Sequence, residues 1–219
     1  MFSPLSLGVL ISGSGSNLQA IIDAIERAEL KAVIRVVISN RDDAYGLTRA
    51  QRHNLPTVVI SHKDFSSRGA FEAALIETLQ AHSVELVVLA GFMRLLSPIV
   101  IRAFPQRIMN IHPALLPAFP GTHAQRQALE RGVRIAGATV HFVDEEMDHG
   151  PIIMQAAVPV YPDDDEESLS ARILAQEHRI YPQAIQLFAK GRLEIRGRTV
   201  IVHNEARSSA ISLRSPESA

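Results

Sequence analysis

The chain has 219 residues, of which 47% are hydrophobic and 21% are charged, so it can bury a sizeable core and does not require a second domain. Lysine and arginine number 22 and aspartate and glutamate number 23, and the formal net charge of -1 excludes a global attraction for nucleic acid or an anionic membrane. The sequence contains no cysteine, which excludes disulfide bonds and thiol catalysis and fits a reducing compartment.

The first apolar run of the chain is interpreted as a buried strand. It has no basic segment before it, and Gly13 and Gly15 interrupt it before it could span a bilayer. We therefore expect a cytoplasmic protein without a membrane partner. Similar β-branched runs recur along the chain, and each is short enough for a buried strand. The predicted strands are residues 7–11, 33–38, 57–60, 86–90 and 108–111.

Helical patterns alternate with these strands. Residues 17–29 place Leu18, Ile21 and Ile25 on one stripe, and residues 68–81 repeat the pattern. Alternation of strands and helices predicts a single-domain α/β fold with a mostly parallel, twisted sheet and helices on both faces, similar to Rossmann folds.

The pattern changes in the C-terminal part of the chain. Two extended runs at residues 139–143 and 152–160 are joined by a polar loop at 144–151, and they predict antiparallel additions to the sheet. We expect one domain over residues 1–203. The Ser-, Arg- and Glu-rich residues 204–219 are expected to form a flexible tail.

A long helix is expected over residues 167–189. Pro182 predicts a kink there, because an interior proline removes a helix hydrogen bond. Residues 193–195 and 199–202 flank Gly197 and predict a small hairpin.

A glycine loop, Ser-Gly-Ser-Gly-Ser-Asn at residues 12–17, lies between the first strand and the first helix. Backbone N–H groups and the positive helix end converge on an anion in this geometry, which favours a phosphate. A dinucleotide is not expected, because Leu18 stands where a third glycine belongs and the second strand ends at Asn40 without an acidic ribose ligand. The alternative is a tight turn in which Ser16 or Asn17 caps the helix.

The segment Asn-Ile-His-Pro at residues 110–113 ends a strand at a proline. Side chains two apart in a strand share a face, so Asn110 and His112 point the same way, at the carboxyl end of the strand where ligands bind. An amide and an imidazole can both hydrogen-bond the oxyanion that forms when a carbonyl carbon is attacked. The alternative is a strand end whose Asn and His satisfy turn backbone groups.

A carboxylate is expected to orient the histidine, and the loop at 144–151 offers candidates. We select Asp148, which is closely followed by Gly150. A nearby aspartate favours the charged imidazole, which can donate a proton to the oxyanion. The alternative is a solvated acidic turn, because sequence separation alone establishes no contact.

Four segments of the chain, in this order, carry a resemblance to a known family. They are Ile-Ser-Gly-Ser-Gly-Ser-Asn-Leu-Gln-Ala at 11–20, Leu-Ala-Gly-Phe-Met-Arg at 89–94, Asn-Ile-His-Pro-Ala-Leu-Leu-Pro at 110–117 and Gln-Glu-His at 176–178. Together they resemble the phosphoribosylglycinamide formyltransferase family of folate-dependent enzymes. The resemblance implies that 10-formyltetrahydrofolate donates a formyl group to the amine of 5-phosphoribosyl-glycinamide, in purine biosynthesis and without a covalent enzyme intermediate.

The resemblance also implies roles for individual residues. Asn110, His112 and Asp148 match the catalytic residues of the family. The phosphate and ribose are expected at Gly15, Ser16, Asn17 and Glu177, with the phosphate loop in the N-terminal half of the domain and the folate site in the C-terminal half. The residues expected to bind folate are Arg68, Phe92, Met93, Arg94, Leu95, Leu96, Asn110, Val143, Asp144 and Asp148.

For some of these residues a structural role is the alternative. Phe92, Leu95 and Leu96 could be plain core residues, and Arg68 could be a solvated helix start. Apolar residues would otherwise wall the pterin ring, and the guanidinium groups of Arg68 and Arg94 would pair with the carboxylates of the glutamate tail.

Three positions depart from the family's pattern. Ala114 stands where many relatives have serine, Gln125 where a histidine is frequent, and His149 interrupts the usual Asp-Gly-Gly of the acidic loop. The resemblance also points to a cis peptide bond at Leu116-Pro117.

Other enzymes share the Asn-x-His segment, namely those that formylate initiator methionyl-tRNA or amino sugars and those that hydrolyse the formyl donor. The glycine loop favours a phosphorylated substrate over hydrolysis, and a phosphate-binding module without turnover is the alternative outside the enzymes. No histidine pair has the His-x-x-x-His spacing of a helical zinc site, so no metal is expected. The expected partners are small-molecule substrates rather than nucleic acid, in a monomer or homodimer.

Overall fold

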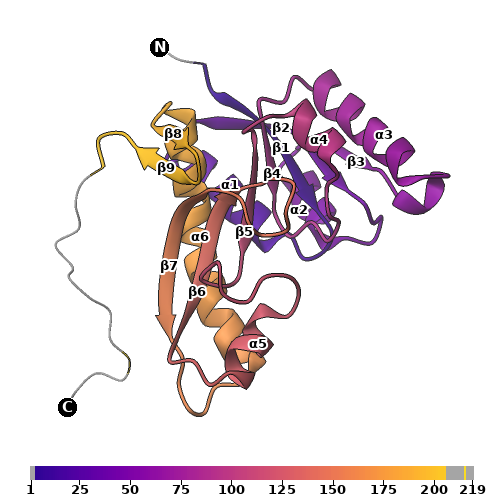
Figure 1. Ribbon diagram of the computed structural model, residues 1–219. Helices are drawn as coiled ribbons and strands as arrows, with labels where there is room; N and C mark the ends of the chain where they lie inside the picture. The colour runs from indigo at the N-terminus through magenta and orange to yellow at the C-terminus, as the bar shows by residue number, and fades with distance from the viewer. Residues whose placement is uncertain (1–2, 206–214, 216–219) are drawn as a thin grey trace.

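A computed structural model of the chain describes residues 3–205 and residue 215. The tail expected over residues 204–219 lies almost entirely outside this part. The described part is built on one nine-stranded sheet with helices on both faces (Figure 1), which confirms the predicted α/β fold.

The N-terminal half contributes five parallel strands, which confirm the buried strands predicted there. They are β1 (Leu5–Ile11), β2 (Ala32–Ser39), β3 (Thr57–Val59), β4 (Leu86–Leu89) and β5 (Ile108–His112). Their spatial order is β3-β2-β1-β4-β5, so the chain builds outward from β1 on one side and from β4 on the other. The strand order therefore reverses between β1 and β4, and ligands of open parallel sheets bind at the carboxyl ends of two such strands.

The C-terminal half extends the sheet beyond β5. The strands are β6 (Ile135–Phe142), β7 (Ile152–Pro159), β8 (Leu193–Arg196) and β9 (Thr199–Val202). β6 is antiparallel to both β5 and β7, and β8 and β9 form an antiparallel hairpin whose strand β9 lies next to β7. The predicted antiparallel additions and the predicted hairpin are confirmed.

Helices cover both faces of the sheet (Figure 1). They are α1 (Ser16–Glu26), α2 (Tyr45–Arg52), α3 (Arg68–Ala81), α4 (Pro98–Ala103), α5 (Ala124–Glu130) and α6 (Glu166–Ala189), together with the 3-10 helix η1 (His62–Asp64). Helices α1 and α6 share one hydrophobic cluster, and α3 and α4 share the other.

Side chains that alternate along β1 pack into different hydrophobic clusters on the two faces of the sheet. Val9 and Ile11 are fully buried with α1 and α6, whereas Leu10 between them is fully buried with α3 and α4. Successive side chains of a strand point to opposite faces, so a strand buried on both faces is apolar throughout. Gly8 is the small position of this strand, because a Cβ there would lie 2.6 Å from Leu79 of α3.

Local sequence signals mark the starts of helices α6 and α4. Helix α6 begins with a capping box, in which Asp165 accepts from Ser168 N at 2.8 Å and Ser168 Oγ accepts from Asp165 N at 3.1 Å. The helix is not interrupted at Pro182 and continues to Ala189. The sequence pattern does not predict α2, α4 and α5, although Ser97 followed by Pro98 is a typical helix start for α4.

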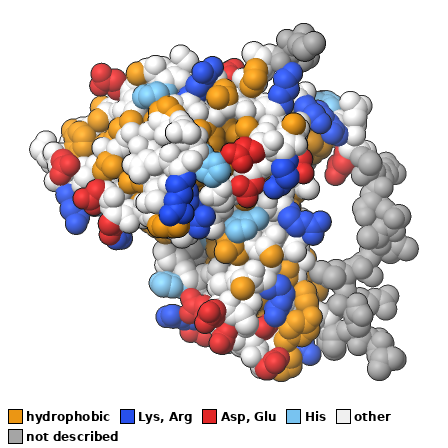
Figure 2. Space-filling model, turned by 180° about the vertical axis from the view of Figure 1, so that it is seen from behind, with side chains coloured by type: hydrophobic (Ala, Val, Ile, Leu, Met, Phe, Trp, Pro, Cys, Tyr) orange, Lys and Arg blue, Asp and Glu red, His pale blue; other side chains and the backbone are white. Residues whose placement is uncertain are grey.

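The surface carries both signs of charge. Figure 2 shows acidic and basic side chains interspersed on the face turned away from the viewer of Figure 1. Among the helices of residues 3–205, none is long and apolar enough to cross a membrane.

Candidate active site

The glycine loop between β1 and α1 is tightly packed. Gly15 has a φ of 69° and precedes α1 as its N-cap, and no side-chain hydrogen bond from the described residues caps this helix. A Cβ on Gly15 would lie 2.5 Å from the Cα of Gly46 in α2, and Gly46 N donates to Gly13 O at 3.0 Å. The capping role considered for Ser16 or Asn17 is therefore wrong, and the loop turns with its helix end uncovered.

Asn17 and Glu177 meet beneath this loop. Asn17 Nδ2 donates to Glu177 Oε2 at 2.7 Å, and the two residues are only 8% and 6% exposed. Burial raises the pKa of the Glu177 carboxyl, while the hydrogen bond from Asn17 opposes this shift. The buried Oδ1 of Asn17 has no hydrogen-bond partner within the described part of the chain. The structure thus joins two predicted substrate residues that the sequence separates widely.

Tyr181 holds this part of α6 against the sheet. It is fully buried, and its hydroxyl lies 3.0 Å from both Leu89 O and Met109 O. Tyr181 follows Glu177 by one helical turn, so the two side chains lie on the same face of α6. The backbone of β4 and β5 therefore fixes the helix that carries Glu177.

Ser12 joins the loops that follow β1, β2 and β4. Its hydroxyl donates to Asn40 Oδ1 at 2.6 Å and accepts from Met93 N at 2.8 Å, and Ser12 N donates to Gly91 O at 3.0 Å. Sequence analysis does not identify Ser12 as a linking residue. Its bonds tie the glycine loop to the expected folate segment at the point where the strand order reverses.

Asn110 and His112 come from adjacent positions on one face of β5. The register pairs Asn110 with His141 and His112 with Thr139 on the antiparallel strand β6. The loop after β6 then brings Asp148 to them, with its Oδ2 3.4 Å from His112 Nδ1. The three residues selected from the sequence are therefore grouped in space.

Asp148 is held in an unusual backbone conformation. Its φ is 53°, in the left-handed region that few residues other than glycine adopt. Gly121 N donates to Asp148 Oδ2 at 2.8 Å, and the side chain is 11% exposed. The carboxylate thus bridges the loop after β5 and the loop after β6.

His112 has an acceptor at each ring nitrogen. Nε2 lies 2.8 Å from Phe119 O, and Nδ1 faces the Asp148 carboxylate. A doubly protonated imidazole satisfies both contacts, because both of its nitrogens are donors. In this arrangement the Nε2 proton is directed at Phe119 O.

His141 is a site residue that sequence analysis misses. Its Nδ1 lies 2.9 Å from Phe142 O and its Nε2 lies 3.2 Å from Asn110 Nδ2. A neutral ring protonated on Nδ1 satisfies both contacts, and burial lowers the pKa of His141 in agreement with this form. The sequence shows a histidine in the strand that follows Asn110 along the chain. Only the β5–β6 register reveals that this histidine lies opposite Asn110.

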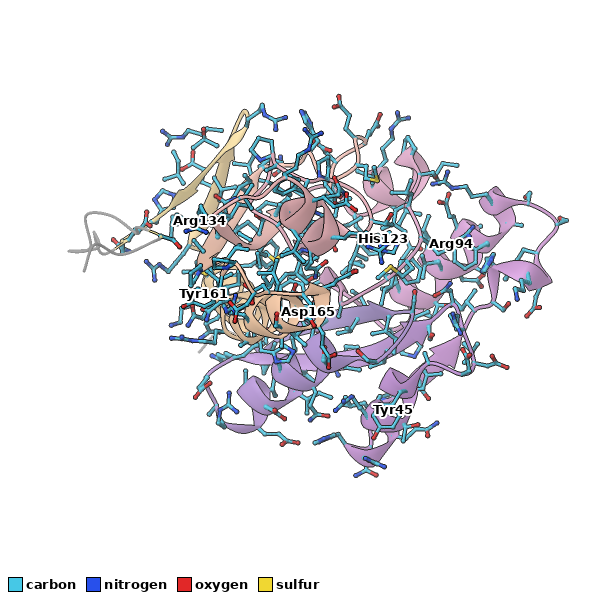
Figure 3. All side chains as sticks on the ribbon, turned by 90° about the horizontal axis from the view of Figure 1, so that it is seen from below. Tyr45, Arg94, His123, Arg134, Tyr161 and Asp165 are labelled. Carbon is cyan, nitrogen blue, oxygen red and sulfur yellow. The ribbon has the colours of Figure 1, made fainter. Side chains whose placement is uncertain are left out.

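The expected folate residues lie after β4, at the start of α3 and after β6. Met93 and Leu95 are 73% and 63% exposed, so neither is a core residue. Phe92, Leu96 and Val143 are partly buried against the core beside α3 and α4. For Phe92 and Leu96 this agrees with the alternative that they are core residues. In Figure 3, Arg94 lies far from Tyr45, which marks the start of α2.

Arg68 is the first residue of α3 and its side chain is 52% exposed, as the structural alternative requires, but it also makes two hydrogen bonds. Its Nε donates to Glu72 Oε1 at 3.0 Å and its Nη2 donates to Leu95 O at 2.8 Å. Glu72 is 1% exposed and also accepts from Ser97 N at 2.9 Å. Arg68 and Glu72 therefore fix the backbone of the segment that carries Met93 and Leu95.

Two further expectations concern this region. The peptide bond between Leu116 and Pro117 is cis, as the resemblance indicates. Among the described residues, no group of three or more His, Asp and Glu side chains is arranged to hold a metal ion.

Comparison with known proteins shows the family to which the chain belongs. The chain matches the formyl transferase family model over residues 6–185. It is 48% identical to phosphoribosylglycinamide formyltransferase from Escherichia coli (strain K12), over 87% of this chain and 90% of that protein. A crystal structure of glycinamide ribonucleotide transformylase 1 from Symbiobacterium toebii has a TM-score of 0.91 and 57% identity, over 92% of this chain and 95% of that one. A formyltetrahydrofolate deformylase from Pseudomonas syringae pv. tomato is similar at 26% identity and a TM-score of 0.87, over 92% of this chain and 67% of that one.

Proposed function

The chain belongs to the formyl transferase family, and we infer that it has phosphoribosylglycinamide formyltransferase activity. It transfers the formyl group of 10-formyltetrahydrofolate to the amine of 5-phosphoribosyl-glycinamide, giving 5-phosphoribosyl-N-formylglycinamide and tetrahydrofolate in de novo purine biosynthesis. The observation that carries this function is the 48% identity to a curated enzyme of that name across most of both chains.

The proposed reaction is a direct transfer through a tetrahedral intermediate. The neutral amine attacks the formyl carbon, and the new carbon–nitrogen bond pushes charge onto the formyl oxygen. The bond from that carbon to the folate nitrogen then breaks. The attacking amine loses a proton, and the departing folate nitrogen gains one. Donors aimed at the developing oxyanion lower the barrier, because they interact more strongly with the transition state than with the substrate.

Asn110 is the first proposed oxyanion donor. Its amide group carries two hydrogens, and one of them is directed at His141 Nε2. The second hydrogen is available to the substrate. His141 thus orients the amide, and its neutral form supplies the lone pair that this contact needs.

His112 is the second proposed donor, and Asp148 supports its charge. An imidazolium stabilises an oxyanion better than a neutral ring, and the Asp148 carboxylate lies 3.4 Å from Nδ1, on the side of the ring away from Nε2. The Nε2 proton can reach the substrate once its contact with Phe119 O opens. Asp148 also contacts His141, whose Nε2 lies 3.8 Å from Asp148 Oδ1.

The proposed phosphate site is the loop of Gly15, Ser16 and Asn17. The N–H groups of this loop are at the start of α1, where a helix favours an anion. Glu177 is the proposed ribose ligand, because one of its oxygens accepts from Asn17 and the other can accept from a sugar hydroxyl.

The proposed folate site faces this loop across the point where the strand order reverses. Met93 and Leu95 supply exposed apolar surface for the pterin ring, and Arg68 and Arg94 supply positive charge for the glutamate tail. Phe92 and Leu96 belong to the same segment as Met93, and the remaining proposed contacts come from β5 and from the loop after β6, at Asn110, Val143, Asp144 and Asp148.

The proposal extends the formyltransferase domain over residues 1–203. A cytoplasmic location and a monomeric or homodimeric state are part of the proposal. Light scattering of the purified protein tests the oligomeric state, because a mass above twice 24.0 kDa would contradict it.

The test of function is a panel of acceptors. The protein is incubated with 10-formyltetrahydrofolate and with 5-phosphoribosyl-glycinamide, glycinamide, an amino sugar or water alone, and the products are identified by mass. We expect the phosphorylated amine to be formylated and glycinamide without the phosphoribosyl group to react poorly. Formate release at an equal rate without any amine would identify a hydrolase, and no consumption of the donor would identify a binding module.

A further inference from the structure

The β8–β9 hairpin contacts the loop that carries Asp148. Arg198 lies in the turn of this hairpin, beyond residue 185 where the match to the family model ends. Arg198 Nη2 donates to His149 O at 2.7 Å, and Nη1 lies 2.7 Å from His149 Nε2 and 2.9 Å from His149 Nδ1. One hairpin side chain therefore contacts both the backbone and the ring of the residue next to Asp148.

The contacts of His149 define how its ring is held. Nδ1 lies 3.3 Å from Asp144 Oδ2 and 3.5 Å from Glu146 Oε2, and the tautomer with its proton on Nδ1 directs that proton at carboxylates. The Nε2 lone pair is then free to accept from the guanidinium of Arg198. A glycine at this position could keep the backbone contact with Arg198 but would lack the ring.

The loop is held at two further points beside this contact. Asp148 accepts from Gly121 N while it adopts a positive φ. Gly150 lies so close to β6 that a Cβ there would be 1.9 Å from Phe142 O. Residues 148–150 are thus held at Asp148 by the loop after β5, at His149 by the hairpin and at Gly150 by β6.

We propose that Arg198 is a positioning residue of the proposed reaction. By holding the carbonyl and the ring of His149, it keeps the 144–150 loop in the conformation that sets Asp148 against His112 and Asp144 beside the folate. This proposal rests on the proposed function of the loop. The phosphate and ribose residues lie on α1 and α6, outside the loop that Arg198 holds.

The kinetic test is Arg198→Ala. Loss of a charge-assisted hydrogen bond at a partly exposed site should raise the KM for 10-formyltetrahydrofolate and lower kcat, each by about fivefold. The KM for 5-phosphoribosyl-glycinamide should stay unchanged. Arg198→Lys retains one donor and should restore part of both losses, whereas a role in overall stability alone would leave both KM values unchanged.

Arg196→Ala is the matched control, because Arg196 belongs to the same hairpin and pairs with Glu194 at 2.6 Å instead of with the loop. We expect wild-type kinetics for this variant. Equal kinetic losses in Arg196→Ala and Arg198→Ala would overturn the proposal, since they would assign the effect to the hairpin or to lost charge. Wild-type kinetics in Arg198→Ala would overturn it as well.

Amide hydrogen exchange gives a readout that does not depend on the reaction. In Arg198→Ala, exchange should accelerate in peptides that cover residues 143–151 and stay unchanged in β1 and α1. Uniform acceleration across the chain, or none in the loop, would contradict a local positioning role. If the wild-type protein forms no formylated amine, the proposed function fails, while the exchange result still decides whether Arg198 holds the loop.

Discussion

Single hydrogen bonds set the chemistry of the proposed reaction centre. Asn110 and His112 share a strand face, but their surroundings differ: His141 orients the Asn110 amide, whereas Phe119 O and Asp148 occupy both nitrogens of His112. The second amide hydrogen of Asn110 is therefore the donor that we propose for the oxyanion.

The variant Asn110→Ala tests this donor. We predict that kcat falls about a hundredfold to a thousandfold, the usual effect of removing one oxyanion donor, while both KM values change little. Steady-state kinetics measure the effect, and thermal unfolding checks that the fold is retained. Near-normal turnover in a folded Asn110→Ala protein would remove Asn110 from the mechanism.

Glu177 makes stability depend on pH. Burial raises the pKa of its carboxyl above the ordinary value of 4.5. Because the unfolded chain ionises this group at lower pH than the folded protein does, its favourable contribution is complete below 4.5 and is lost as pH rises through the folded pKa. The buried charge that then forms is solvated poorly.

The variant Glu177→Gln removes this charge at every pH. Its amide can also donate to Asn17 Oδ1, which has no partner in the structure of residues 3–205. We predict that the melting temperature of the variant, relative to wild type, rises as pH increases from about 4 to about 8. Calorimetry at several pH values measures this difference. Glu167→Gln, an exposed change on the same helix, is the control, and a pH-independent difference for Glu177→Gln would refute the burial argument.

At the scale of elements, the glycine loop depends on the close approach of α1 and α2. Gly15 combines a positive φ with a contact to Gly46 that leaves no space for a Cβ. At Gly13, two residues earlier, a Cβ would have open space around it, because no heavy atom of the described chain outside the neighbouring residues lies within 4 Å. The two glycines therefore form a matched pair for substitution.

Gly15→Ala should destabilise the protein by about 1–3 kcal/mol, because a left-handed alanine and a shifted helix both add strain. It should also raise the KM for 5-phosphoribosyl-glycinamide more than the KM for folate. Urea unfolding and steady-state kinetics provide these values. Gly13→Ala should be much milder in stability, and equal losses in both variants would argue against the Gly15–Gly46 contact as the cause.

Helices and strands with a clear pattern of hydrophobic residues could be predicted from the sequence, and those without such a pattern could not. The parallel strands are continuous β-branched runs because both of their faces are buried, and residues 68–81 bound a helix as predicted. Helices α2 and α5 escape prediction because they are short and, within the described part of the chain, start without a side-chain cap. For α4, the start signal of Ser97 and Pro98 is present but the helix is short.

The same distinction applies to the candidate site. The Asn110 and His112 pair follows from the period of a strand, so local sequence is sufficient. Asp148 is one of several carboxylates in its loop and its selection rests mainly on the family resemblance, because its 3.4 Å approach to His112 follows from loop geometry. His141 and Arg198 depend on which strands and loops lie side by side, and no local pattern encodes that.

At the scale of the whole molecule, the reversal of strand order explains why these residues meet. The loops after β1 and β4 leave the sheet at the same edge, where Ser12 joins them, and α6 brings Glu177 under the first of these loops. The antiparallel strand β6 ends beside Met109, near the start of β5, and the loop that follows folds back to place Asp148 3.4 Å from His112. The proposed phosphate site and the proposed reaction centre are thus joined through one network of loops.

The most direct measurement is a single turnover with enzyme in excess over 10-formyltetrahydrofolate and with 5-phosphoribosyl-glycinamide present. The fate of the formyl carbon is followed by isotope label. We predict that nearly all of the label appears in 5-phosphoribosyl-N-formylglycinamide and that little is released as formate. Release of the label as formate at the same rate with and without the amine would contradict formyl transfer as the function of this site.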